Sequence, residues 1–382
     1  MNPRALAAAA AAAAYLAAHL WLTIGWRQAA LFAVGLMAGV ALYHAAFGFG
    51  GAWRSLLQER RSAGLRAQLV MLGVTVAVFL PLLAGGELLG TTLRGSAAPL
   101  GVSLVVGAFL FGVGMQVGGA CASGTLFTVG GGSTRMLLTL AGFIAGSVLG
   151  ARHIETWHSA PALPPVSLLQ SYGPWMALAA SLALLAGVWL VVSAMERRRH
   201  GTLEPTWRAL GRSELLRGPW PLLLGALTLA AVNCATLALA GRPWGVTSAF
   251  ALWGSKLVAA TGIDVAGWSY WQSAARAESL RASVLADVTS VMNFGIVLGA
   301  LLAASLAGRF APVWRLPWRS LAAAVLGGVL LGYGARLAYG CNIGALFGGI
   351  ASASLHGWVW FAAALLGNAA GMRLRPLFAR AS

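Results

Sequence analysis

Ten apolar runs, each long enough to cross a bilayer, constrain this fold more than any other sequence feature. A transmembrane helix needs about 20 apolar residues. Apolar residues make up 59 % of the 382-residue chain and charged residues only 9 %, and a water-soluble protein could not bury that much apolar surface. The sequence therefore predicts an all-α polytopic membrane protein with about ten transmembrane helices. These cover residues 5–23, 28–46, 67–85, 98–117, 135–151, 174–195, 219–240, 283–305, 320–338 and 356–372.

Four further apolar segments are too short or too rich in glycine to cross a bilayer. They are residues 47–57, 119–131, 244–258 and 341–352. Broken apolar segments at membrane depth are tolerated only where the backbone is buried in protein or lines a cavity, as in the discontinuous helices of transporters. We predict that these four segments form short re-entrant helices.

The net charge of +17 comes from basic residues that lie in short clusters between the apolar runs. This pattern is typical of loop charges that set membrane orientation, and it argues against nucleic-acid binding. If the N-terminus is cytoplasmic, most of the 26 Lys and Arg residues fall on the cytoplasmic side, which predicts that both termini are cytoplasmic. Arg242, Lys256 and Arg336 are then charges of the outer side. The first apolar run lacks a polar cleavage region, so we expect it to be a retained transmembrane helix.

The chain contains two related halves. Residues 111–131 align with residues 331–349 at a constant offset, which places Cys121 opposite Cys341. Four spans in the first half and one linking span mean that the second half starts from the opposite face, so the repeats are predicted to be inverted. The predicted organisation is an extra N-terminal transmembrane helix in 1–26, a first repeat in 27–152, a linking helix and cytoplasmic linker in 153–218, and a second, inverted repeat in 219–382.

Cys121 and Cys341 are the leading candidates for a functional site. Each lies where an apolar helix gives way to irregular backbone, between small residues at equivalent positions of the two halves. Helix N-termini supply positive potential and free N–H groups, which attract anions and stabilise thiolates. A polarisable sulfur there can contact a sulfur-containing anion and still release it. The flanking residues of this candidate pathway are Gly119, Gly124, Gly340, Asn342 and Gly344.

These motifs resemble the YeeE/YedE family of sulfur transporters, whose characterised activity is thiosulfate uptake. The resemblance rests on GACASGTL, GRPWGVTSAFALWG, DVTSVMNFG and GCNIG, which start at residues 119, 241, 287 and 340 and so cover both halves. It implies a multi-pass protein of the bacterial inner membrane, without enzymatic activity or a cofactor. It also implies a central pathway in which cysteine thiols contact the terminal sulfur of the substrate in sequence.

One position departs from the family pattern. Members often carry a third cysteine in a segment like 47–49, and this chain has Gly48 there. Either two thiols suffice, or Cys234 substitutes from elsewhere, or the substrate differs. By itself, a lone cysteine such as Cys234 in an apolar helix is more often a small core residue.

Several other polar residues have a functional and a structural interpretation. Lys256, the only lysine, is either an anion attractor or a side chain that reaches the membrane interface. Asp287 is either a proton carrier or, as we favour, a capping residue at the start of a helix. We expect His356 to be solvated or interfacial. Thr247 and Ser248 are hydroxyl groups at the predicted membrane depth that either donate to the oxygens of an anion or join helices.

The sequence thus predicts import of a small sulfur-containing anion, thiosulfate first, which would contact Cys341 and then Cys121. The alternatives are a membrane thiol redox or sulfur-relay protein, and a transporter of a selenium or sulfite species. The expected partners are the anion, the lipid bilayer and a cytoplasmic sulfur-carrier protein. No Cys/His cluster has the spacing of metal ligands, so we expect no zinc site.

Overall fold

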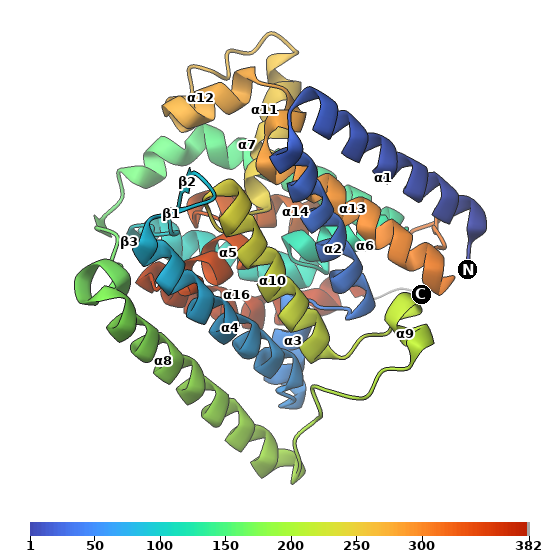
Figure 1. The fold of residues 1–382 in the computed structure, drawn as a ribbon, viewed down its shortest axis with the longest axis vertical. Coiled ribbons are helices and arrows are strands. Elements are labelled where there is room, and N and C mark those ends of the chain that lie inside the picture. Colours follow the sequence, from blue (N-terminus) through green and yellow to red (C-terminus); the bar gives the residue numbers. More distant parts are fainter. Residues whose placement is uncertain (380–382) are drawn as a thin grey trace.

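The computed structural model describes residues 1–379 and is almost entirely helical (Figure 1). Two pairs of very short strands complete it: β1 (Glu87–Leu88) with β2 (Thr91–Thr92), and β3 (Leu100–Gly101) with β4 (Ala162–Leu163). The long helices are α1 (Pro3–Thr23), α2 (Trp26–His44), α4 (Ala63–Gly85), α5 (Val102–Gly118), α7 (Thr134–His158), α8 (Leu168–His200), α10 (Leu222–Ala240), α13 (Val288–Ala307), α14 (Trp318–Leu337) and α16 (Leu355–Ala379).

Nine helical stretches within the described residues are long and apolar enough to cross a membrane, and each overlaps one of the ten predicted runs. The tenth, 356–372, is helical as part of α16 but is not one of the nine. That helix carries the buried polar side chains of His356 and Asn368, which lower its apolar character. The predicted all-α polytopic class is confirmed.

All four predicted re-entrant segments contain short helices. Residues 47–57 contain α3 (Phe49–Arg54) and the start of a π-helical turn, η1 (Ser55–Glu59). Residues 119–131 contain α6 (Ala122–Gly130), and residues 244–258 contain most of α11 (Thr247–Ala259). Residues 341–352 contain η4 (Asn342–Phe347) and α15 (Gly348–Ala351). The remaining short helices are peripheral: α9 (Arg212–Arg217), η2 (Ser269–Trp271), α12 (Ala274–Arg281) and η3 (Val284–Ala286).

Helix α13 begins at a side-chain cap. Asp287 is its N-cap, and its carboxylate accepts hydrogen bonds at 2.7 Å from both the backbone N–H and the hydroxyl of Ser290. A carboxylate at this position satisfies free N–H groups and interacts favourably with the helix dipole. The structural interpretation of Asp287 is therefore confirmed.

Glycines bring the two halves into backbone contact at the centre of the molecule. A Cβ added to Gly112 of α5 would lie 2.1 Å from the Ala364 carbonyl oxygen of α16. At the equivalent position of α14, a Cβ added to Gly332 would lie 2.1 Å from the Phe143 carbonyl oxygen of α7. Small residues allow such close helix approach in membranes. Each half therefore packs its last long helix against the other half.

Helices α5 and α14 pack against each other in opposite directions. A Cβ added to Gly114 would lie 2.9 Å from the Gly327 carbonyl oxygen, and one added to Gly334 would lie 2.5 Å from the Gly107 carbonyl oxygen. Later residues of one helix thus meet earlier residues of the other. Gly107 and Gly327 occupy equivalent positions of the two halves, as do Gly114 and Gly334, so the two contacts are reciprocal.

Two long helices lie at the periphery. Helix α1 runs along one edge of the molecule, where it contacts α2 and α13, and α8 runs along the opposite edge, where it contacts α4 (Figure 1). Helix α8 includes the predicted span at 174–195 and begins before a kink at Gly173, whose φ is +76°.

Candidate functional site

The two predicted cysteines occupy the same structural position in the two halves. Cys121 is the N-cap of α6, and Cys341 is the N-cap of η4, both with extended backbone. In each case the carbonyl of the cysteine accepts a 2.8 Å hydrogen bond from the N–H four residues later, at Thr125 and Ala345. An N-cap side chain lies next to the free N–H groups of the first helical turn. Both thiols are therefore beside groups that favour an anion.

Glycines produce the turns that deliver these cysteines. Gly119 ends α5 with a φ of +95°, and Gly340 precedes Cys341 with a φ of +150°, a region that favours glycine. Gly124 lies beside the Cys121 thiol, because an added Cβ would be 3.3 Å from that sulfur. Gly344, in contrast, has open space around the position of an added Cβ.

The two thiols lie together in the interior. Cys121 is 2 % exposed and Cys341 1 % exposed, and both belong to one buried cluster. The backbone N–H groups of Ile343 and Gly344 face the Cys341 sulfur. The structure thus brings together the two cysteines that the sequence aligned.

Asn342 adds an unsatisfied amide to this centre. Its side chain is completely buried, and neither its amide nitrogen nor its amide oxygen has a hydrogen-bond partner within the described residues. A buried amide without partners costs free energy, of the order of 1–3 kcal/mol. A polar ligand passing Cys341 would satisfy it.

A cavity of about 320 Å³ adjoins Cys341. Its lining includes Gly340 and Gly344, together with the predicted hydroxyl residues Thr247 and Ser248. Three guanidinium groups also line it, and no Asp or Glu stands among its described lining residues. We call it the arginine cavity, after Arg242, Arg276 and Arg336.

Hydrogen bonds hold the arginine side chains in place. Arg336 is 8 % exposed and donates to the Tyr270 hydroxyl at 2.5 Å and to Thr247 Oγ1 at 2.8 Å, while its Nε has no partner within the described residues. Arg276 stacks on the Tyr270 ring, 4.3 Å from the centroid. These contacts go to neutral groups, so the positive charge remains available to an anion.

Arg242 forms the far wall of the same cavity. It donates to Thr289 Oγ1 at 3.0 Å, and Ser248 also donates to that oxygen at 3.0 Å. Burial lowers the pKa of the Arg242 guanidinium, and the carboxylate of Asp287 opposes this shift. A guanidinium starts from so high a pKa that Arg242 stays cationic at neutral pH.

A second cavity, of about 220 Å³, lies beside Gly48, the N-cap of α3. We call it the α3 cavity; its charged lining residues are Arg61 and Glu204. Helices α4 and α10 connect the two cavities. Their first residues line the α3 cavity, and the loops that follow their last residues line the arginine cavity. The two cavities therefore lie at opposite ends of membrane-spanning helices.

Neither thiol lines either cavity. Cys341 is buried behind the wall formed by Gly340 and Gly344, and Cys121 lies deeper among apolar side chains. Both thiols are therefore enclosed in the protein interior, outside the two cavities.

Other predicted site residues lie elsewhere. The Lys256 ammonium donates to the Leu280 and Ala282 carbonyls at 2.7 Å, so it caps the C-terminal end of α12 and does not line the arginine cavity. Cys234 packs beside Phe79 and Leu237 in a separate apolar cluster, away from the other two cysteines. The expectation that His356 is interfacial is wrong, because it is fully buried and bonds the Ser354 hydroxyl.

The sequence places Arg336 only among the charges of the outer side and does not indicate that it lines a cavity. It lies inside α14 and is buried in the cavity wall. A single ionisable residue within an apolar span is by default a candidate for function, and that signal was present in the sequence. Tyr270 and Arg276 gave no such signal, because they come from a polar loop whose position only the fold defines.

A polytopic helical protein with a cationic cavity above buried thiols has the features of an anion transporter. Residues 44–370 match the protein family described as Sulphur transport. The chain therefore belongs to this sulphur transport family.

Three curated proteins illustrate the similarity. The thiosulfate transporter TsuA of Spirochaeta thermophila is 25 % identical over 359 residues, which cover 88 % of this chain and 95 % of TsuA. The probable transporter YedE of Escherichia coli is 32 % identical over 180 residues, which cover 45 % of this chain and 42 % of YedE. YedE of Salmonella typhimurium is 31 % identical over the same length. The match thus spans less than half of either YedE protein.

Proposed function

We propose that this protein imports thiosulfate across the bacterial inner membrane, through the arginine cavity, Cys341, Cys121 and the α3 cavity in that order. Thiosulfate carries sulfonate-type oxygens at one end and a terminal sulfur at the other. Guanidinium and hydroxyl groups suit the oxygens, and a thiol suits the sulfur. The similarity to TsuA supports this substrate, and the E. coli relative supports the location.

The arginine cavity is the capture site. Its charge raises the local concentration of an anion, and its low-dielectric walls strengthen the attraction. The anion then occupies the open space beside Gly344. There it reaches the Cys341 thiol, the unsatisfied Asn342 amide and the N–H groups at the start of η4. No covalent bond forms. Weak successive contacts at Cys341 and Cys121 allow both binding and release.

Movement of the short helices opens the closed path. They are the natural moving parts, because the long helices are held by backbone contacts through Gly112 and Gly332. The position of both cysteines at N-caps of short helices is the single observation that carries this proposal. Each movement of α6 or η4 shifts a thiol and its neighbouring N–H groups together.

The two halves form an inverted repeat, with residues 27–152 and 219–382 as its units. The reciprocal, opposite-direction contacts of α5 and α14 support this organisation, since a two-fold axis in the membrane plane produces that arrangement. Both termini are cytoplasmic in this orientation, which puts the arginine cavity outside. A cytoplasmic sulfur-carrier protein is the proposed acceptor, and capture through the 196–217 linker tests that partner.

Uptake of labelled thiosulfate into proteoliposomes tests the proposal. Cys121→Ala and Cys341→Ala should each lower uptake at least tenfold, because the anion loses one of its two sulfur contacts in a desolvated path; that factor corresponds to roughly 1.4 kcal/mol. Cys234→Ala is the matched control, since it removes a thiol of the same chain outside the path, and it should transport like the wild type.

Two results would contradict the proposal. One is normal uptake by both Cys121→Ala and Cys341→Ala at equal protein content. The other is a disulfide between these residues that cycles during turnover, detected as a mass shift, which would favour a thiol redox protein. Competition by sulfite or a selenium oxyanion, measured in the same vesicles, defines which anion is preferred.

A further inference from the structure

A shallow groove of about 650 Å³ lies at the end of α8, far from the cysteine path in the chain. One wall is α8 and the other is Arg60, which follows η1 in the left-handed conformation with a φ of +58°. We call it the α8 groove. Its lining residues are Arg60, Val191, Ala194, Met195, Arg198 and Arg199.

The α8 residues of this groove form one continuous face of the helix. Their spacing of three and four residues stacks them above one another. The apolar members lie toward the middle of the helix, and Val191 is 68 % exposed. The two arginines lie in its last turn. The apolar residues thus form the floor of the groove, and the arginines form a cationic rim where α8 ends at the membrane interface.

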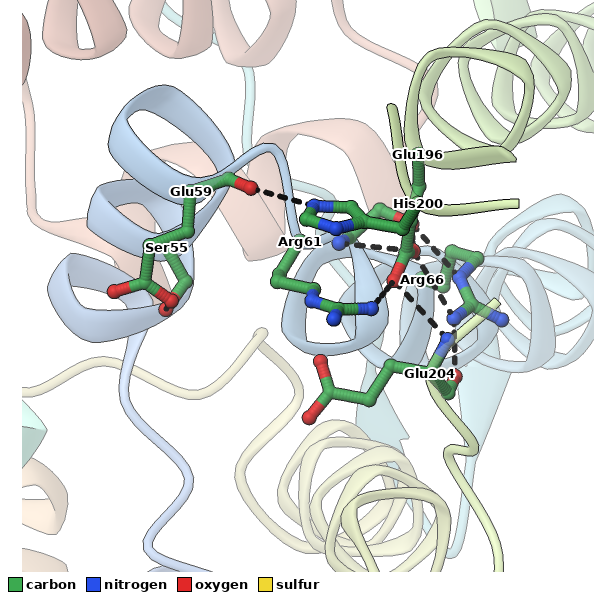
Figure 2. A network of polar contacts seen from close by, with 8 residues as sticks. Ser55, Glu59, Arg61, Arg66, Glu196, His200 and Glu204 are labelled. Atoms are coloured by element: carbon green, nitrogen blue, oxygen red, sulfur yellow. Dashed lines mark hydrogen bonds and ion pairs between the residues drawn. The ribbon is translucent and has the colours of Figure 1, made fainter. Parts of the chain in front are cut away.

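The acidic residue of α8 is already paired within the protein. Glu196 is completely buried on the adjacent face of α8, where it pairs with Arg61 at 3.5 Å and Arg66 at 3.4 Å and accepts a hydrogen bond from the Ser62 N–H at 3.1 Å. Figure 2 shows this carboxylate within a network of polar contacts that includes Arg61 and Arg66. His200 bonds the Glu59 carbonyl oxygen at 2.8 Å and fixes the same helix end.

The groove arginines are therefore left with free charge. Among residues 1–379, none of the three groove arginines forms an ion pair, and the recorded partner of Arg60 is the Met195 sulfur at 3.6 Å. Guanidinium groups of this kind bind phosphate through two parallel hydrogen bonds. A basic pocket beside a transmembrane helix is the kind of site that holds an anionic lipid headgroup.

We propose that the α8 groove binds one anionic phospholipid, with its phosphate between the three arginines and an acyl chain along the apolar floor. The charge and the apolar floor together select a lipid over a free phosphate ion, because only the lipid covers both. The bound lipid would cover the exposed face of α8 that forms the groove.

Native mass spectrometry of the delipidated protein in detergent tests this proposal, with phosphatidylglycerol, phosphatidylcholine and inorganic phosphate as separate titrants. The first phosphatidylglycerol should bind at least tenfold more tightly than phosphatidylcholine. Replacing Arg60, Arg198 and Arg199 with glutamine should weaken it by about fivefold per residue, since each arginine near a lipid surface contributes on the order of 1 kcal/mol.

Arg197→Gln is the matched control, because Arg197 belongs to the same basic run but does not line the groove, and its affinity should stay that of the wild type. Ala194→Trp should also weaken lipid binding, because it fills the floor without changing charge. Equal losses in Arg197→Gln and Arg198→Gln would overturn the proposal. So would inorganic phosphate that binds as tightly as the lipid, or an unchanged affinity in Ala194→Trp.

Discussion

The arginine cavity and the α3 cavity are built on equivalent parts of the two halves, yet they differ in charge. Arg336 of α14 and Gln116 of α5 occupy equivalent positions. Arg336 donates to Thr247 of the short helix α11, and Gln116 donates to the Gly50 carbonyl of the short helix α3 at 3.0 Å. In both halves the long helix donates a hydrogen bond to a short helix, but only in the second half is the donor a cation.

This difference indicates how a symmetric frame can bind an anion more strongly at one end. Three arginines without an acidic neighbour among the described lining residues face the arginine cavity, whereas Arg61 of the α3 cavity is accompanied by Glu204 and also pairs with Glu196. An anion is thus attracted at one end and meets a nearly balanced surface at the other. In the proposed pathway, this difference in charge would separate capture from release.

Arg336→Gln should reduce this asymmetry, because it removes one of the three cavity charges and gives the second half the side chain of the first. We expect the affinity for the anion, and with it the uptake rate at low substrate concentration, to fall about 30-fold. A charge-assisted hydrogen bond in a buried site contributes roughly 1.5–3 kcal/mol. Initial uptake rates in proteoliposomes measure the effect. The exposed Arg315→Gln is the control and should behave as the wild type, and equal behaviour of the two variants would refute the role of the cavity charge.

Valine substitutions at Gly344 and Gly48 compare the two cavities sterically. A Cβ at either glycine meets no atom within 4 Å, so both variants should fold with unchanged thermal stability. Gly344→Val should raise the half-saturating thiosulfate concentration by about tenfold, because it fills the capture site; this equals roughly 1.4 kcal/mol. Gly48→Val should lower the maximal rate and leave that concentration unchanged. The reverse pattern would mean that the anion enters from the α3 side.

The smallest expected effect is that of pH on capture. The cations of the arginine cavity are all guanidinium groups, and Asp287 opposes the lowering of the Arg242 pKa by burial. Guanidinium groups in general are cationic throughout the neutral range, so thiosulfate affinity should change less than about twofold between roughly pH 6 and pH 8. Equilibrium binding at fixed ionic strength measures this. A steep loss above pH 7 would require a titrating group outside the cavity.

Much of this architecture follows from local sequence patterns. Apolar length predicted the spans, and glycine-rich interruptions predicted the short helices, because both depend on neighbouring residues along the chain. The offset between Cys121 and Cys341 predicted their common position, which the structure has at two N-caps. That these thiols carry substrate is still a prediction.

The lining of the arginine cavity depends on contacts between distant segments. Tyr270 comes from the loop between α11 and α13, and its hydroxyl meets Arg336 across 66 positions of sequence. Lys256 carries a positive charge that would suit an anion site. It lies where α12 ends, however, and donates to carbonyl groups there. No local pattern distinguishes these two outcomes, because the tertiary fold decides which carbonyl or hydroxyl each cation meets.

The glycine contacts at Gly112 and Gly332 have a consequence for the transport cycle. Because α16 is locked to α5 and α7 to α14, each half is interlaced with the other through backbone atoms. Rocking of one half against the other would have to break both seams at once. The long helices would therefore form a rigid frame, and the proposed turnover would proceed through small local displacements within it, as in a gated pore and unlike a carrier with two swinging lobes.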